Sequence, residues 1–373
     1  MMKTAKLFAI VTLALAICMS SAELNAKQND ANAFEVNKHL GRGINLGNAL
    51  DAPREGEWGV TLREEYFKII KDAGFDSVRI PVRWSNHALT EKPYTIDPNF
   101  FKRVDWAVNN AFKNNLYVML NMHHYMELYK EPIPEKERFM ALWTQIAEHY
   151  KGYPDTLTLE IFNEPDDAFT PELWNEWLKE AHAIIRKANP TKTIVIGPGN
   201  DNWANYLRFL ELPEDDRNII VTIHHYFPHD FTHQGAPWMT HEKIMQNIED
   251  KKLVGQKLPA WAKDDWKGDS NTFLGTKWTG TAEEKKDMTD ILDVGAAWGK
   301  KHNRPINLGE FGAIAKADME SRARWTKFMA DSAVERGMSF HYWEFCQENF
   351  GAYSQNKKAW NEPLLNALIP PKK

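Results

Sequence analysis

Two glutamates follow directly on apolar runs and are the candidates for acid–base or nucleophilic chemistry. Glu164 lies in the segment Ile161-Phe162-Asn163-Glu164-Pro165, and Glu310 lies in Gly309-Glu310-Phe311-Gly312. A carboxylate beside a buried strand loses hydration, which raises its pKa towards that of a general acid. We expect Pro165 to hold Glu164 extended and the glycines around Glu310 to let a substrate approach closely. Either glutamate taken alone is equally consistent with an ordinary turn.

A pair of opposed carboxylates is what cleavage of a glycosidic bond requires. One protonates the departing oxygen, and the other attacks the anomeric carbon or activates a water molecule. Arg79 stands within the otherwise apolar run Ser77–Pro81, and a buried guanidinium needs a carboxylate partner. We expect that partner to be the nucleophile, which would stay ionised beside the cation. A structural ion pair with another acid is the alternative.

Two further apolar runs end in His123-His124-Tyr125 and His224-His225-Tyr226. Because neighbouring residues of a strand point to opposite faces, His224 and Tyr226 share one side of the sheet and His225 takes the other. The Tyr226 phenol could donate a hydrogen bond to the nucleophile, and the imidazoles could bind sugar hydroxyls. Each histidine is also consistent with a buried residue whose hydrogen bonds are satisfied within the protein.

Tryptophan is common in this chain, which contains 15 of them. A core can absorb many tryptophans, but sugar-binding sites also use flat aromatic faces, against which the C–H groups of a pyranose pack. Trp343, in Tyr342-Trp343-Glu344-Phe345, follows the last apolar run and is a candidate for the floor under a sugar ring. Composition leaves the core and the binding interpretations equally open.

The histidines also suggest a metal-dependent hydrolase as a rival interpretation. The sequence has no His-x-His at the end of the first apolar run and no His-Glu-x-x-His helix. The polar residues that follow that first run, Asn45, Asn48 and Asp51, suit sugar hydroxyls better than a metal ion. We therefore predict that the site uses no metal and no cofactor.

Short apolar runs alternate with amphipathic segments along the chain. The apolar runs, which we expect to be strands, are 43–47, 77–81, 116–121, 157–162, 193–197, 219–223, 305–309 and 338–343. The segments with apolar residues at helical spacing are 62–73, 99–114, 136–150, 171–188, 283–301 and 319–336. Strands that are apolar on both faces and separated by helices indicate a parallel sheet. The pattern predicts a closed (β/α)8 TIM barrel, with an open doubly wound sheet as the alternative.

In such a barrel, Glu164 and Glu310 follow the fourth and seventh strands, which face each other across the mouth where functional side chains gather. No composition break divides residues 23–373, so we expect one catalytic domain. The stretch from Met239 to Gly280 interrupts the pattern after the sixth strand. It is long, charged and contains Trp261, Trp266 and Trp278, and we expect an elaborated loop on the active face.

Residues 1–22 are typical of an export signal, with a basic start, an apolar stretch over 7–17 and the small residues Ser20-Ser21-Ala22. The apolar stretch is shorter than the roughly 20 residues of a membrane-spanning helix. We therefore expect cleavage, secretion and no membrane attachment afterwards. Cys346 would then be the only cysteine, which excludes an intramolecular disulfide. The net charge of −5, with both signs interspersed, gives no case for nucleic-acid binding, and we expect a monomer.

Taken together, these residues resemble the signature of glycoside hydrolase family 5, also called cellulase family A. The matching residues are Arg79, His123, Asn163-Glu164-Pro165, His224-x-Tyr226, Gly309-Glu310-Phe311-Gly312 and Trp343. The resemblance runs from about Gly41 to Leu368. It is especially close to bacterial endo-β-1,4-glucanases with the motifs seen here from Gly41 to Leu50 and from Phe231 to Ala236.

The resemblance implies a retaining double displacement, in which Glu310 attacks the anomeric carbon and Glu164 protonates the departing sugar and later activates water. It also implies that Arg79 and Tyr226 orient Glu310 and that Asn163 binds the 2-hydroxyl. The implied sugar contacts are His123, His124 and His224 in the central subsites, Trp343 next to the cleaved bond, and Asn48, Asp51 and Trp238 further along the cleft. Asp51 stands where glutamate is familiar, and the stretch from Met239 to Gly280 is longer than in near relatives, so the distal subsites and the substrate preference stay open.

The function so indicated is a secreted endo-β-1,4-glucanase that acts on cellulose and related β-glucans. A β-mannanase, or an enzyme that acts on both polysaccharides, is the alternative, because the two sugars differ at the 2-hydroxyl, which is read near Asn163, His123 and His124. A non-catalytic carbohydrate-binding barrel is the alternative from another class. The presence of both carboxylates together with their orienting partners argues against it.

Overall fold

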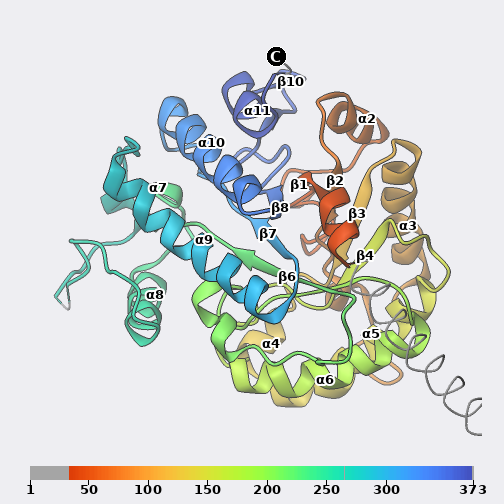
Figure 1. The fold of residues 1–373 in the computed structure, drawn as a ribbon. Coiled ribbons are helices and arrows are strands. Elements are labelled where there is room, and N and C mark those ends of the chain that lie inside the picture. The colour runs from red at the N-terminus through yellow and green to blue at the C-terminus, as the bar shows by residue number, and fades with distance from the viewer. Residues whose placement is uncertain (1–32, 264, 372–373) are drawn as a thin grey trace, which may run out of the picture.

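The computed structural model of this chain describes residues 33–263 and 265–371. Within them, eight parallel strands form a closed barrel in which each strand pairs with the next and the eighth returns to the first (Figure 1). They are β1 (Arg42–Asn45), β2 (Ser77–Ile80), β3 (Tyr117–Asn121), β4 (Leu157–Glu160), β5 (Ile194–Ile196), β6 (Ile219–His224), β7 (Ile306–Glu310) and β8 (Ser339–Tyr342). The predicted closed barrel is confirmed and the open sheet is excluded. The predicted signal peptide, residues 1–22, lies outside the described residues.

The barrel strands are buried on both faces, which is why their sequences are nearly continuous apolar runs. A separate cluster fills the amino-terminal end of the barrel, and its members are Ala33, Val36, Leu40, Met119, Val195 and Ile220. The first three belong to a helical stretch over 33–40. Asn37 ties this stretch to the strand starts, since it donates to the Ile306 carbonyl at 3.2 Å and accepts from the Ser339 hydroxyl at 2.6 Å. This closed end leaves the carboxyl ends of the strands for the functional side chains.

Helices surround the barrel (Figure 1), and all six predicted helices are present, with ends that differ from the sequence-based ranges by a few residues; the short helix over 126–130 was not predicted. They are α2 (Glu64–Asp72), α3 (Pro98–Lys113), α4 (Met126–Lys130), α5 (Pro132–His149), α6 (Pro171–Ala188), α9 (Ala282–His302), α10 (Met319–Glu335) and α11 (Glu362–Leu368), with 3-10 turns η1 (Trp84–His87) and η2 (Ala204–Phe209). Local signals determine several starts. Thr170 caps α6 before Pro171, and Thr281 forms a capping box with Glu284 at α9.

The stretch after β6 holds helices that the sequence analysis did not predict. They are α7 (His229–Thr232), α8 (His241–Leu253) and η3 (Ser270–Phe273). The pattern misses α8 because its sequence is mostly polar and charged, so it carries little apolar periodicity. These elements pack around their own apolar cluster of Ala236, Met239, Ile244, Phe273, Ile314 and Phe350. Tyr226 and Trp343 lie against that cluster, so the insertion borders the active face as expected.

The tryptophans divide between the core and the active face. Among the described residues, those that are fully buried include Trp84, Trp143, Trp174, Trp177, Trp278 and Trp325. Trp238 is 47 % exposed and Trp343 is half-buried, and both lie after strands β6 and β8 at the active face. Within the described part of the chain, none of the helices has the length and apolar character needed to cross a membrane.

Candidate active site

Glu164 and Glu310 meet at the carboxyl end of the barrel. Glu310 is the last residue of β7, and Glu164 lies in the loop that follows β4. A carboxylate oxygen of each glutamate and a ring nitrogen of His224 all lie within 4.8 Å of one another. The expected convergence of the two carboxylates across the mouth is therefore observed.

Glu310 is held by a donor on each of its oxygens. The Nη1 of Arg79 donates to Oε1 at 2.6 Å, and the Tyr226 hydroxyl donates to Oε2 at 2.9 Å. Burial raises the pKa of Glu310; His224 and Arg79 lower it, whereas Glu164 raises it further. The two donors point the carboxylate and favour its charged form, as a nucleophile needs.

Arg79 binds two acids at once, so both interpretations of its partner are correct. Its Nε and Nη2 donate to the two oxygens of Glu160 at 2.6 and 2.8 Å, while Nη1 reaches Glu310. The remaining bonds go from Nη1 to Asn45 at 2.9 Å and from Nη2 to Asn163 at 2.7 Å. Arg79 and Glu160 are both fully buried.

Glu160 is a site residue that the sequence analysis missed. It ends β4 and so occupies a strand that is otherwise apolar, as Arg79 does in β2. A single charged residue in each of two buried strands was the available signal in the sequence, because a buried charge of one sign needs a partner of the opposite sign.

The backbone of Glu164 is left-handed, with φ at 48°, so the expectation that Pro165 would hold it extended was wrong. Such a conformation is uncommon for glutamate and persists where tertiary contacts impose it. His224 Nδ1 lies 2.6 Å from Oε1, and Asn163 Nδ2 donates to Oε2 at 3.4 Å. Burial raises the pKa of Glu164 to about 7, which is a suitable range for a group that must give and take a proton.

His224 contacts the carboxylate of Glu164 and is not free to bind a sugar hydroxyl through Nδ1. Its Nδ1 faces Glu164, and its Nε2 lies 3.3 Å from the amide nitrogen of Asn202, so both ring nitrogens have protein partners. Burial lowers the pKa of His224 to about 4, and the neutral ring can donate from Nδ1 while accepting from Asn202. His225 points the opposite way, towards the Met288 carbonyl, as the strand alternation predicts.

The loop after β5 supports this arrangement and was not singled out in the sequence. Asn200, Asp201 and Asn202 are all left-handed, with φ of 58°, 55° and 55°. Asn and Asp tolerate this conformation better than most residues. Gly197 is required beneath the loop, because a Cβ there would lie 2.2 Å from the Asn202 side chain.

The glycines around Glu310 lie against neighbouring protein atoms, and their role in substrate approach stays a prediction. A Cβ on Gly309 would lie 2.3 Å from the Thr222 hydroxyl. A Cβ on Gly312 would lie 2.2 Å from the Trp343 carbonyl. Both glycines therefore permit close packing between neighbouring strand ends.

Trp343 lies next to the strand end that holds Glu310, since its backbone N–H donates to the Phe311 carbonyl at 2.9 Å. Its ring stacks parallel to His123, with centroids 5.6 Å apart and 6° between the planes. Gly47 makes room for it, since a Cβ there would come within 2.8 Å of the indole. His123 is itself held by Asn121, whose amide nitrogen lies 3.2 Å from Nδ1.

The polar residues after β1 divide into supporting and accessible groups. Asn45 is fully buried and donates to the backbone carbonyls of Gly309 and His341, so it braces the barrel rather than a sugar. Asp51 is also fully buried, and its oxygens accept from the backbone N–H groups of Asn48 and Ala49 at 3.0 and 2.8 Å. Its predicted contact with sugar is therefore indirect: the carboxylate shapes the turn that presents Asn48.

Three further side chains with exposed surface extend the site beyond the carboxylates. His124 is about one-third exposed at its side chain, and its Nε2 lies 3.8 Å from Asp51. Trp58, which the sequence analysis did not select, packs edge-on against His124 with centroids 5.4 Å apart. Trp238 lies against His233 and Phe350 on the sixth-loop side. Aromatic faces thus flank the site on two different loops.

Two sets of side chains among the described residues have the spacing of metal ligands. They are Glu164 with His224 and Glu310, and Asp51 with His123 and His124. In the first set, Arg79 and Tyr226 already donate to Glu310, and the Arg79 cation opposes a second cation there. In the second, Asp51 is saturated by its own turn. The absence of a metal stays a prediction.

Comparison with known proteins identifies what this site resembles. Residues 24–349 match the family model described as Cellulase (glycosyl hydrolase family 5). Endoglucanase H of Acetivibrio thermocellus is 33 % identical over 343 residues, which cover 91 % of this chain and 34 % of that protein. The chain therefore spans about a third of the length of that relative.

Solved structures give the same picture. Thermotoga maritima Cel5A in complex with cellobiose superposes with a TM-score of 0.80 at 46 % identity, covering 90 % of this chain and 100 % of that one. The structure of Cel5A in complex with mannotriose gives the same TM-score, identity and coverage.

Proposed function

This chain belongs to glycosyl hydrolase family 5, the cellulase family, and on that premise we propose that it is an endo-β-1,4-glucanase that cleaves β-glucan chains with retention. The observation that carries the proposal is the carboxylate pair, with oxygens of Glu164 and Glu310 within 4.8 Å. Different partners surround the two groups: Arg79 and Tyr226 donate to Glu310, whereas His224 faces Glu164.

These partners assign the two steps of the reaction. Glu310, oriented by Arg79 and Tyr226, attacks the anomeric carbon as the bond to the departing sugar breaks. Glu164 passes its proton to the departing oxygen, for which a pKa of about 7 is suitable. Glu164 then takes a proton from water, and the water oxygen displaces Glu310 from the sugar.

Retention is supported by the spacing of the carboxylates. Retaining enzymes hold the two carboxyl groups about 5–5.5 Å apart, whereas inverting enzymes leave about 6.5–9.5 Å for a water molecule between them. One carboxylate oxygen of each glutamate lies within 4.8 Å of the other, a close approach that suits the retaining geometry. The anomer released first from a cello-oligosaccharide, followed by NMR, tests this: the β-anomer is expected, and the α-anomer would overturn retention.

The substrate class is supported by the similarity to Cel5A, which was crystallised with cellobiose and with mannotriose. Glucan and mannan differ at the 2-hydroxyl, and the groups proposed to read it are Asn163, His123 and His124. Activity on both polysaccharides is therefore the second candidate. A panel of carboxymethylcellulose, mixed-linkage glucan, glucomannan and galactomannan separates the two, and activity on mannan alone would contradict the glucanase proposal.

The Glu310→Gln variant tests the nucleophile. Its amide keeps the shape of the side chain but cannot form the glycosyl bond, so we expect a loss of turnover of at least about 10⁴-fold. A circular dichroism melt should show a folded protein. Near-normal turnover would contradict the assignment and would return the metal-dependent alternative to consideration.

Export of a monomeric enzyme is the remaining part of the proposal. The predicted signal ends at Ala22, and the family match begins at residue 24, so the two segments adjoin without overlapping. N-terminal sequencing of secreted protein should begin near Glu23, and light scattering should give the mass of one chain. An intact N-terminus or a dimeric mass would contradict these points separately.

A further inference from the structure

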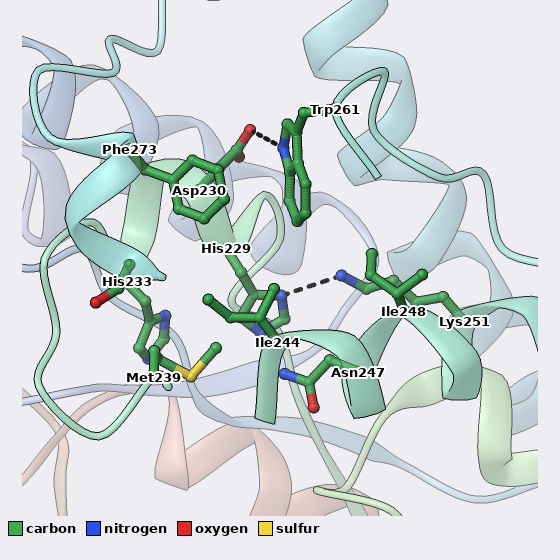
Figure 2. Close-up of a pocket in the computed structure, with 11 residues that line it drawn as sticks. His229, Asp230, His233, Met239, Ile244, Asn247, Ile248, Lys251, Trp261 and Phe273 are labelled. Atoms are coloured by element: carbon green, nitrogen blue, oxygen red, sulfur yellow. Dashed lines mark hydrogen bonds between the residues drawn. The ribbon is translucent and has the colours of Figure 1, made fainter. Parts of the chain in front are cut away.

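The segment that holds α8 is tied to α7, the helix that opens the same loop after β6. Lys251 Nζ lies 3.3 Å from His229 Nδ1 of α7, and Trp261 donates to Asp230 at 2.8 Å, as Figure 2 shows. Ile244 and Ile248 of α8 face the hollow between these groups. That hollow, about 10 Å³, is too small for a sugar, so these contacts serve to anchor the helix.

One turn of α8 reaches back over the active face. Lys243 lies in the first turn of α8, which runs over His241–Leu253. Lys243 Nζ lies 2.5 Å from Asp166 in the loop after β4, and 3.8 Å from Asp201 in the loop after β5. Burial lowers the pKa of Lys243, but Asp201 and Asp166 outweigh it and raise the pKa overall. Three separate loops therefore meet in one charged cluster.

This cluster adjoins the acid/base glutamate. Asp166 lies two positions after Glu164, and the backbone N–H of Asp201 donates to the Pro165 carbonyl at 3.4 Å. Lys243 and Asp166 act on Glu164 in opposite senses: Asp166 raises its pKa and Lys243 lowers it. The two members of one ion pair thus have separable effects on the same carboxyl group.

We propose that Lys243 is a positioning residue for the reaction, which compensates the charge of Asp166 beside Glu164 and so couples the sixth-loop helix to the acid/base. The inference rests on the proposed role of Glu164. It gives the unusual insertion a function in the chemistry itself, besides bordering the cleft.

The other charged or titratable groups that face Glu164 come from every element around it. They are Arg79 of β2, Tyr129 of α4, His224 and Tyr226 at the end of β6, and Glu310 of β7. All of these belong to the inner site and stay unchanged when Lys243 or Asp166 is substituted. Asp167 also raises the pKa of Lys243, and it is not substituted in these variants.

The test measures the pH dependence of kcat/KM on a cello-oligosaccharide and compares the position of its alkaline limb in four variants. Lys243→Met removes a cation, so the Glu164 carboxylate is less stabilised and the limb should move to higher pH by about half a pH unit or more. Asp166→Asn should move it to lower pH, and the double variant should return it close to the wild-type position. Lys243→Arg, which keeps the charge, should leave it in place.

A purely structural role for the ion pair predicts something else. Both single variants would then lose stability or activity without opposite shifts of the limb. Lys257→Met is the matched control, because Lys257 also anchors this insertion, through Glu283 and Asp287 at 2.8 and 2.9 Å, and is absent from the groups that perturb Glu164. Equal or same-direction shifts in Lys243→Met and Asp166→Asn would overturn the proposal.

A second substrate separates failure of this inference from failure of the proposed function. A dinitrophenyl β-cellobioside needs no proton on its leaving group, so the limb shifts should vanish with it if Glu164 is the acid. If Glu164→Gln retains full activity on the oligosaccharide, the proposed function fails. If Glu164→Gln is inactive there but Lys243→Met leaves the limb unmoved, only the role of Lys243 fails.

Discussion

The buried pair of Arg79 and Glu160 allows a quantitative prediction, because the chain contains a matched pair near its surface. In both pairs an arginine binds a glutamate through Nε and Nη2: Arg79 reaches Glu160 at 2.6 and 2.8 Å, and Arg103 reaches Glu55 at 2.7 Å twice. The first pair has no exposed side-chain surface, while Arg103 and Glu55 are 29 % and 19 % exposed. The bidentate geometry is the same in both pairs, but the burial differs, and Arg79 also binds Glu310.

Glu160→Gln leaves the Arg79 charge only partly compensated in a fully buried site. Removing one partner of a buried ion pair costs about 3–5 kcal/mol, whereas an exposed pair contributes about 0–1 kcal/mol. We therefore expect Glu160→Gln to lower the melting temperature by at least about 5 °C and Glu55→Gln by no more than about 2 °C. Turnover should fall in Glu160→Gln alone, by about 10- to 100-fold, because Arg79 can then shift and misplace Glu310.

Differential scanning calorimetry and kcat on a soluble glucan measure both effects. Equal melting temperatures for the two variants would refute the argument that burial makes the Glu160 pair the costly one to break. A destabilised Glu160→Gln protein with unchanged kcat would instead show that Glu160 does not position Glu310 through Arg79.

Two further changes follow from single contacts. Tyr226→Phe removes the donor to Oε2 of Glu310; since that bond favours the charged form, the pKa of Glu310 should rise, the acidic limb of kcat/KM should move to higher pH, and kcat/KM should fall about tenfold. An unmoved acidic limb would argue against Tyr226 as an orienting group. Gly312→Ala places a methyl 2.2 Å from the Trp343 carbonyl, so it should destabilise by at least about 1–3 kcal/mol in denaturant melts. Gly295→Ala, whose methyl would meet the flexible end of Ile223 at 2.9 Å, is the milder comparison, and a larger loss there would contradict the packing argument.

The barrel was predictable because its signals are local and repeated. Strands buried on both faces need apolar runs, and the helices between them carry apolar stripes, so periodicity identifies both without knowledge of their contacts. The prediction failed at α8, where polar residues hide the helix and its apolar partners come from the loop around it. The length and composition of the insertion predicted that it borders the active face. They could not predict that a residue of α8, Lys243, contacts Asp166.

The sequence alone was sufficient to select the two carboxylates and most of their neighbours. Residue type and position at a strand end are properties of the chain, and they limit the chemistry to groups that can attack or carry a proton. They do not say which neighbour each group contacts. For example, the expectation that Pro165 holds Glu164 extended rests on local sterics. In the folded protein a contact between Glu164 and His224, 60 residues away, outweighs that local preference.

Only the tertiary structure decided how the partners are shared. Arg79 joins Glu160 across 81 residues and Glu310 across 231, and the closed barrel is what brings these strands together. Burial then strengthens the interactions of Arg79 with both glutamates, because electrostatic interactions are stronger where water is excluded. The sequence thus determined which groups stand at the strand ends, and the closure of the barrel decided that Arg79 and Tyr226 donate to Glu310 while Glu164 faces His224.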